Sequence, residues 1–88
     1  MRAPITTQLA DVGRRVAELR AGRGWTQETF AERVSRSVQW VRRIEAGANI
    51  TLTTFFGLAR VLGARPADLL ARPKSRIVRQ GRPPRATR

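Results

Sequence analysis

Apolar residues recur along the first part of the chain with the period of an α-helix. Between residues 9 and 19 they are spaced three and four apart, which places them on one face of a helix. Glycines at positions 22 and 24 should end this helix. No window of the sequence alternates with the period of two that marks a half-buried strand. The pattern predicts an all-α domain whose first helix buries Leu9, Val12, Val16 and Leu19.

Four further helices are expected after residue 24, each with a residue suited to its start. Thr26 and Ser37 should cap the second and third helices, because a hydroxyl oxygen can accept a hydrogen bond from a first-turn N–H group. Thr51 or Thr53 should open the fourth helix, and Pro66 suits the first position of a short fifth helix. The expected ends are Val34, then Ala46 before Gly47, then Leu62 before Gly63, and finally Leu70.

Charge divides the chain into two parts. The 88 residues carry a formal net charge of +12. Residues 1–71 hold 11 basic and 6 acidic side chains, whereas residues 72–88 hold 7 basic and none acidic. This last stretch is also rich in proline and too poor in apolar residues to bury a core of its own. We therefore expect an N-terminal arm at 1–7, a folded domain at 8–71 and a basic, disordered tail at 72–88.

The basic residues are almost all arginine, with a single lysine among the 18. Arginine suits phosphate recognition, because its planar guanidinium stays charged and can donate two parallel hydrogen bonds. The base composition of a genome can also favour arginine over lysine on a protein surface. It does not, however, account for three basic residues to each acidic one, so the net charge indicates a polyanionic partner.

Missing residue types exclude several classes of function. The chain contains no Cys and no His, and hence lacks the usual ligands of zinc, haem and iron–sulfur clusters, the thiol nucleophile and the commonest general base. The longest uncharged stretch, residues 46–59, is shorter than the roughly 18 apolar residues of a spanning helix. We expect no enzyme, no catalytic residues, no metal, no cofactor and no membrane segment.

The second and third predicted helices are separated by a turn of only three residues, 35–37. A helix-turn-helix of this size can place its second helix in the major groove of DNA, which is roughly 12 Å wide. At 100° per residue, the apolar residues of that helix face inward, and Gln39, Arg42 and Arg43 face outward. Glutamine can pair with adenine and arginine with guanine. An outward face with these residues and no acid is typical of a surface that reads bases.

A spaced series of residues runs without gaps from about Val12 to Leu70. It comprises Gly24-Trp25-Thr26-Gln27-Glu28, Ala31, Ser37, Val41, Ile44-Glu45, Gly47, Leu52, Ala59, Leu62-Gly63 and Leu69-Leu70. In these residues the chain resembles the Cro/C1 (XRE) family of helix-turn-helix proteins, which have a lambda repressor-like, five-helix fold. Segments 24–27 and 51–56 look most like HipB-type antitoxins, which repress their own operons and bind a kinase-like toxin. The controller proteins of restriction–modification systems are similar in their compact layout.

The resemblance implies a role for each matching position in the two central helices. Base reading would fall to Val38, Gln39 and Arg43, with Val38 packing on a thymine methyl group. Contacts to the DNA backbone would come from Gln27, Ser37 and Arg42.

The family also pairs an arginine late in the first helix with a glutamate late in the third. The matching residues here are Arg20 and Glu45, so we expect a structural ion pair rather than a catalytic carboxylate.

The chain departs from the family pattern in two places, the turn at residues 35–36 and Trp40. Ser35 and Arg36 stand where the family has glycine and then an apolar residue, and serine tolerates positive φ less easily than glycine. Arg36 either contacts the DNA backbone or marks a reoriented turn. Trp40 lies at the edge of the inner face, where its ring serves the core or a subunit contact, or lies against sugar and phosphate with its N–H donating.

We expect the protein to form a dimer and its tail to contact phosphates. A single module contacts few base pairs, so the resemblance implies a homodimer on a near-palindromic site, with third helices roughly 34 Å apart. Phe56, Val61 and Leu69 exceed what one small core needs and mark the expected contact patch. Tail contacts to phosphate would come from Lys74, Arg76 and Arg79.

These features predict a sequence-specific regulator of transcription that binds double-stranded DNA as a dimer, most simply a repressor, in the cytoplasm at the nucleoid. Three alternatives stay open. The chain is an antitoxin that binds a toxin protein, a restriction–modification controller or, should the tail dominate, a general architectural or RNA-binding protein.

Overall fold

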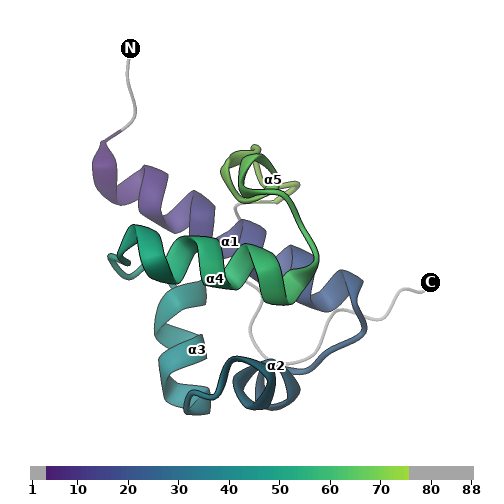
Figure 1. Ribbon diagram of the computed structural model, residues 1–88. Helices are drawn as coiled ribbons and strands as arrows, with labels where there is room; N and C mark the ends of the chain where they lie inside the picture. The colour runs from purple at the N-terminus through teal and green to yellow at the C-terminus, as the bar shows by residue number, and fades with distance from the viewer. Residues whose placement is uncertain (1–3, 76–88) are drawn as a thin grey trace, which may run out of the picture.

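The computed structural model describes residues 4–75, which form five helices and, within that range, no strand. The predicted all-α fold class is confirmed, and Figure 1 shows α1 and α4 crossing the middle of the molecule, α5 above them and α2 and α3 below. The helices are α1 (Ile5–Gly22), α2 (Gln27–Val34), α3 (Val38–Glu45), α4 (Leu52–Leu62) and α5 (Pro66–Leu70). Most of the predicted tail, residues 76–88, lies outside the described residues.

Hydroxyl caps begin the three central helices, as expected. The side-chain oxygens of Thr26, Ser37 and Thr51 each accept a hydrogen bond from a backbone N–H three residues further on, at 3.0 to 3.1 Å. Thr51 rather than Thr53 therefore opens α4. These bonds satisfy helix N–H groups that have no partner within the helix, so each helix starts at its hydroxyl cap.

The short helix α5 is capped by a carboxylate. Asp68 accepts a hydrogen bond at 2.9 Å from the backbone N–H of Arg65, and the guanidinium of Arg65 lies 3.3 Å from the same carboxylate. The backbone hydrogen bond, followed by the side-chain bond, holds the pKa of Asp68 below its ordinary value. The charged form of Asp68 is thus the form that stabilises the start of α5.

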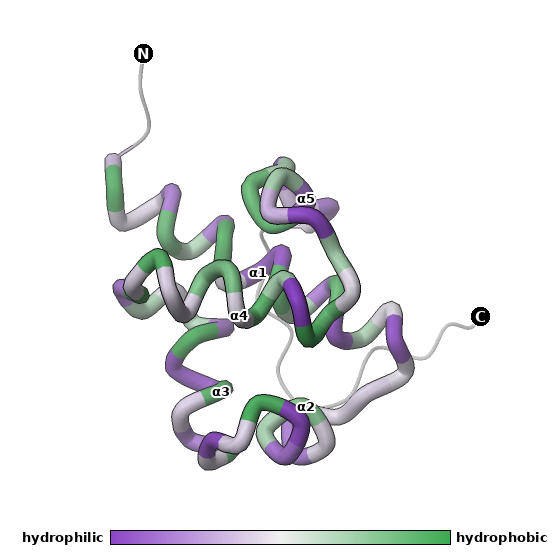
Figure 2. The backbone as a smooth tube through the Cα atoms, viewed as in Figure 1, coloured by the Kyte–Doolittle hydropathy of each residue, from purple (hydrophilic) through white to green (hydrophobic). Residues whose placement is uncertain are grey.

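Every helix contributes one large, fully buried side chain to the core, so the five helices depend on one another. In Figure 2 hydrophobic and hydrophilic positions alternate along α1, whereas most of α4 is hydrophobic or neutral. The fully buried residues are Val16, Phe30, Val41, Leu58 and Leu69, one from each helix in chain order. The assignment of Leu69 to a subunit contact is therefore wrong, because the short α5 uses this side chain to close the core against α1 and α4.

The packed region extends beyond the expected boundaries at both ends. Helix α1 begins at Ile5, within the stretch expected to be an arm. At the other end Pro73 is buried, and Glu18 Oε2 accepts hydrogen bonds from the backbone N–H groups of Lys74 and Ser75, at 2.7 and 3.2 Å. The first residues of the predicted tail are thereby held against α1. Charge and composition alone gave no indication of this contact, which depends on a carboxylate 56 residues away.

Candidate nucleic-acid interface

The turn between α2 and α3 is short because Ser35 adopts a left-handed conformation, with φ +58° and ψ +46°. The N–H of Arg36 then reaches back to the carbonyl oxygen of Ala31 at 2.9 Å. Ser35 is the residue that stands where the family has glycine, and it is the one non-glycine residue with positive φ among residues 4–75. The turn thus adopts a left-handed conformation without glycine, the residue that adopts it most easily.

Helix α3 presents two different faces. Val41 and Ile44 are buried and fix the helix to the core, whereas Gln39, Arg42 and Arg43 are exposed. The outward face predicted from helical geometry is therefore present as an exposed surface. It carries two guanidinium groups and one carboxamide, all of which can donate hydrogen bonds to base edges or phosphates.

The other expected contact residues at the start of α3 are less free. Ser37 is exposed, but its hydroxyl oxygen already accepts a hydrogen bond from the backbone N–H of Trp40 at 3.1 Å. Val38 is half-buried and packs against the core, so only part of its side chain faces outward.

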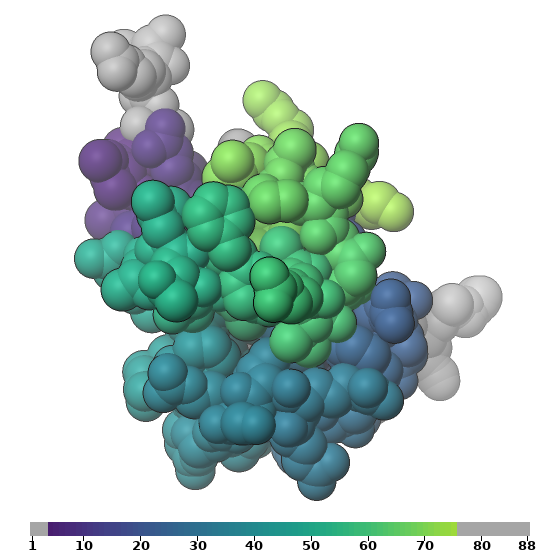
Figure 3. Space-filling model, viewed as in Figure 1, coloured from purple at the N-terminus to yellow at the C-terminus, as the bar shows by residue number. Residues whose placement is uncertain are grey.

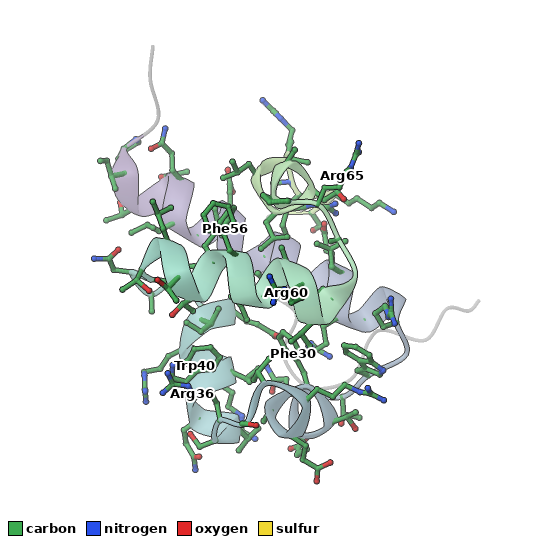
Figure 4. All side chains as sticks on the ribbon, in the orientation of Figure 1. Phe30, Arg36, Trp40, Phe56, Arg60 and Arg65 are labelled. Atoms are coloured by element: carbon green, nitrogen blue, oxygen red, sulfur yellow. The ribbon has the colours of Figure 1, made fainter. Side chains whose placement is uncertain are left out.

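Trp40 and Arg36 form a stacked pair beside α3. Trp40 is half-buried and packs against the core, and the guanidinium carbon of Arg36 lies 4.9 Å from the centre of its ring. Figure 4 shows the two side chains together at α3, far from Arg65 at the start of α5. Arg36 is exposed, so its charge remains accessible to solvent beside α3. The stack gives Trp40 a core contact and a surface contact at once.

A partly buried ion pair supports this region from beneath. The Nε of Arg20 lies 2.6 Å from Glu45 Oε2, and its Nη2 donates to Glu45 Oε1 at 3.2 Å. Arg20 Nη1 also donates to the carbonyl oxygen of Trp25 at 2.7 Å. The side chains are only 16% and 7% exposed, respectively. The pair therefore ties the end of α3 to α1 and to the loop before α2.

Gln27, the first residue of α2, lies between this ion pair and the surface. Its Nε2 donates to Glu45 Oε1 at 3.0 Å, and its Oε1 accepts from Arg42 Nε at 3.4 Å. Arg42 in turn approaches Glu28, with 3.7 Å between Nη2 and Oε2. Sequence reasoning placed Gln27 and Arg42 near DNA but missed these bonds, because the contacts depend on how α2 and α3 are placed in space.

Helices α1 and α3 approach each other at the backbone, a feature that sequence reasoning also missed. A Cβ added at Gly13 would lie 2.5 Å from the carbonyl oxygen of Ile44, and one added at Gly47 would lie 2.9 Å from Cα of Ala10. Both glycines are therefore needed for packing, and Gly47 also has φ +104°. The available signal was a glycine in the middle of a helix, which lowers helix propensity and usually has a packing reason.

Helix α4 offers a surface of another kind. Leu52 is 71% exposed and Phe56 52% exposed, whereas Val61 is partly buried against the core. Figure 3 shows α4 and α5 covering the upper part of one face, with α2 and the start of α3 along its lower edge. Leu52 and Phe56 are one helical turn apart on α4; Ile5 and Leu70 are the other large apolar residues exposed among residues 4–75. We call Leu52 and Phe56 the apolar surface of α4.

The remaining expectations concern the tail, membrane-crossing helices and metal ligands. Lys74 is exposed, whereas Arg76 and Arg79 lie outside the described residues. Among the helices of residues 4–75, none combines the length and the hydropathy that a membrane-crossing segment requires. Over the same range no three His, Cys, Asp or Glu side chains gather closely enough to hold a metal ion.

Comparison with known proteins agrees with this geometry. Residues 11–72 match the family model of a helix-turn-helix domain. The restriction-modification controller protein C.AhdI from Aeromonas hydrophila is 33% identical; the match covers 72% of this chain and 97% of that one, with a TM-score of 0.67. A hypothetical transcription factor from Neisseria, NHTF, is 26% identical over 84% of this chain and 87% of its own, with a TM-score of 0.68. Among curated proteins, no sequence matches significantly.

Proposed function

Since this chain belongs to the XRE-like helix-turn-helix family and is a DNA-binding regulator, we propose that it is a dimeric repressor that occupies a near-palindromic operator. The observation that carries the proposal is the outward face of α3, where Gln39, Arg42 and Arg43 are exposed while Val41 and Ile44 hold the helix in place. A rigid helix with donors on its outer side is suited to the major groove.

Base reading in this proposal is assigned to Gln39 and Arg43, with Val38 against a thymine methyl group. Gln27 and Ser37 contact phosphates at the N-termini of α2 and α3, where the helix dipoles favour negative charge. Arg42, together with the stacked pair of Arg36 and Trp40, contacts the DNA backbone beside the groove. The exposure of Arg36 and Arg42 supports these roles.

Dimerisation is proposed through the apolar surface of α4. Burying Phe56 and Leu52 against a second copy would remove their exposed area from water, and two copies would read two half-sites. Phe56 keeps its place in the expected contact patch, Val61 contributes its exposed part, and Leu69 no longer belongs to the patch.

The basic tail is proposed to add sequence-independent phosphate contacts through Lys74, Arg76 and Arg79. The hydrogen bonds that Glu18 accepts from the backbone of residues 74 and 75 support this proposal, because they hold the start of the tail against α1. Removing residues 76–88 should weaken binding to all duplexes alike. The salt dependence of log Kd should also become shallower, by roughly 0.9 for each phosphate that the tail neutralises.

Control of restriction–modification genes is a second candidate function. The likeness to C.AhdI, which extends over 97% of that controller, favours it. Restriction and methyltransferase genes beside the coding sequence, with a footprint upstream of them, would support this function. The antitoxin hypothesis and its toxin partner stay predictions from the sequence resemblance. We also propose that the protein has no enzymatic activity and acts in the cytoplasm.

Selection from random duplexes tests the main proposal. The full-length protein is incubated with a library of random double-stranded DNA, and the bound fraction is sequenced over several rounds. We expect enrichment of two inverted half-sites with centres about 10 base pairs, or roughly 34 Å, apart. Binding without enrichment of any sequence would contradict the proposal and would favour a general architectural protein.

A further inference from the structure

We propose that Glu45 is a positioning residue for DNA binding: its carboxylate, fixed by Arg20, sets the orientation of the Gln27 carboxamide at the start of α2. The inference rests on the proposed function, in which Gln27 contacts a DNA phosphate. It assigns to Glu45 a role beyond joining α1 to α3, because the same carboxylate then controls a group on the DNA-binding surface.

The carboxylate of Glu45 is itself immobile. Both oxygens bind Arg20, at 2.6 Å from Oε2 to Nε and 3.2 Å from Oε1 to Nη2, and the side chain is 7% exposed. Oε1 still accepts a hydrogen bond from Gln27 Nε2 at 3.0 Å. A bidentate arginine pair fixes the plane of a carboxylate, so the acceptor that Gln27 meets has one position and one direction.

The neighbours of Gln27 permit only one orientation of its carboxamide. An ionised carboxylate only accepts hydrogen bonds, and a guanidinium only donates them. Nε2 must therefore face Glu45, and Oε1 must face Arg42 Nε, 3.4 Å away. Reversing the amide would set oxygen against oxygen at Glu45 and N–H against N–H at Arg42. Nε2 keeps a second N–H, which an external acceptor can use.

A fixed carboxamide has a direct consequence for binding. A mobile glutamine loses rotamer freedom when it contacts a phosphate, whereas a glutamine already held in place loses little. Gln27 is also the first residue of α2, where backbone N–H groups favour an anion. Glu45 thus prepares a donor at the place where the phosphate is proposed to bind.

Side-chain relaxation of the free, full-length protein tests the orientation without any variant. The ¹⁵N order parameter of the Gln27 carboxamide should approach that of rigid backbone, about 0.85, while that of the exposed Gln39 should fall below about 0.6. A Gln27 carboxamide as mobile as that of Gln39 would overturn the inference.

A double-mutant cycle on operator binding tests the consequence. Gln27→Ala is measured in the wild-type background and in the Arg20→Met/Glu45→Met background, which replaces the buried pair with apolar side chains of similar length. We expect Gln27→Ala to raise Kd about tenfold in the wild type and less than about twofold in the second background. Lys74→Ala is the matched control: Lys74 is exposed and its backbone is held by Glu18 rather than Glu45, so its fold-change should be the same in both.

The outcomes separate the inference from the function on which it rests. Equal losses for Gln27→Ala in the two backgrounds would show that Glu45 is only structural, and would overturn the inference while the repressor proposal stands. A wild-type protein that binds no duplex would overturn both, even if the Gln27 carboxamide is rigid.

Discussion

The surface formed by α2 and α3 and the apolar surface of α4 differ in what they offer to other molecules. The first presents Arg36, Gln39, Arg42 and Arg43, all of them exposed. The second presents leucine and phenylalanine side chains that are 71% and 52% exposed. Contacts to the first should weaken as salt screens charge, whereas contacts to the second should change little with salt.

The two surfaces also differ in how they are supported. A partly buried ion pair and a backbone-to-backbone contact at Gly13 lie beneath α3, whereas α4 rests mainly on apolar packing. A helix that reads bases must be held in a fixed position, because small displacements change its hydrogen bonds. A surface that buries apolar area tolerates more displacement. Substitutions in each of the two surfaces test this difference, and they follow in order of decreasing expected effect.

Loss of one partner of the buried ion pair should have the largest effect on stability. Arg20→Ala leaves the carboxylate of Glu45 buried without its charge partner, and should lower the free energy of unfolding by about 3–5 kcal/mol. Urea denaturation followed by circular dichroism measures it. Arg65→Ala is the matched control, because its pair with Asp68 is exposed, and it should cost less than about 1 kcal/mol. Similar losses for both variants would contradict this account.

Filling the backbone contact between α1 and α3 should also destabilise the protein. Gly13→Ala places a methyl group against the carbonyl oxygens of Ile44 and Glu45, and should cost roughly 2–3 kcal/mol. Gly57→Ala provides the control in α4, where an added Cβ meets no atom within 4 Å, and should stabilise by roughly 0.5–1 kcal/mol. Thermal unfolding of the two variants compares them. A harmless alanine at position 13 would show that α3 is not held in this way.

Removal of the aromatic ring from α4 should affect self-association and leave folding intact. Phe56→Ser should raise the dimer dissociation constant by a factor on the order of ten or more, because large exposed aromatic residues often dominate interfaces. Sedimentation equilibrium at low and high salt measures the effect. Arg36→Ser should leave self-association unchanged and weaken DNA binding instead. The proposed interface would be ruled out by a Phe56→Ser protein that dimerises like the wild type.

A glycine in the turn should stabilise the α2–α3 region slightly. Ser35→Gly relieves a left-handed conformation that costs a serine roughly 1 kcal/mol, although the more flexible unfolded chain offsets part of this gain. We expect a gain of up to about 1 kcal/mol by chemical denaturation, with unchanged DNA binding. A loss of stability would mean that the hydroxyl makes a contact that the turn requires.

The smallest effect should be the pH dependence that comes from Asp68. Its pKa is lowered in the folded protein, so its contribution to stability is complete above the ordinary value of 3.8 and is lost as the pH falls through the lowered pKa. The stability of wild type should exceed that of Asp68→Asn near pH 7, and the difference should shrink as the pH falls below 3.8. Urea denaturation of both proteins from pH 7 down to acid pH tests whether the stability difference shrinks in this direction.

Local features of the fold followed from the sequence, because residues near in the chain determine them. The caps at Thr26, Ser37 and Thr51 need only a hydroxyl three residues before a free N–H. The outward face of α3 required only its helical period. These features are set within one or two turns, so pattern and residue type predicted them, apart from the choice between Thr51 and Thr53.

Features that join distant parts of the chain were not predictable in this way. The contacts of Glu18 with residues 74 and 75, and those of Gln27 with Glu45 and Arg42, depend on how the helices are placed in space. Leu69 was misjudged for a related reason: its burial depends on where α5 docks, and a five-residue helix has too few residues to show an inner face. Packing, rather than local propensity, decides all of these.

The central claim is that α3 reads bases with its outward face, and Arg43 tests it most directly. Operator and unrelated duplexes are titrated with Arg43→Ala and with Arg65→Ala, which removes the same charge far from α3 (Figure 4). The account predicts that Arg43→Ala reduces the preference for operator by roughly 5- to 100-fold, while Arg65→Ala leaves it unchanged. Equal weakening on both duplexes by Arg43→Ala would contradict base reading by α3.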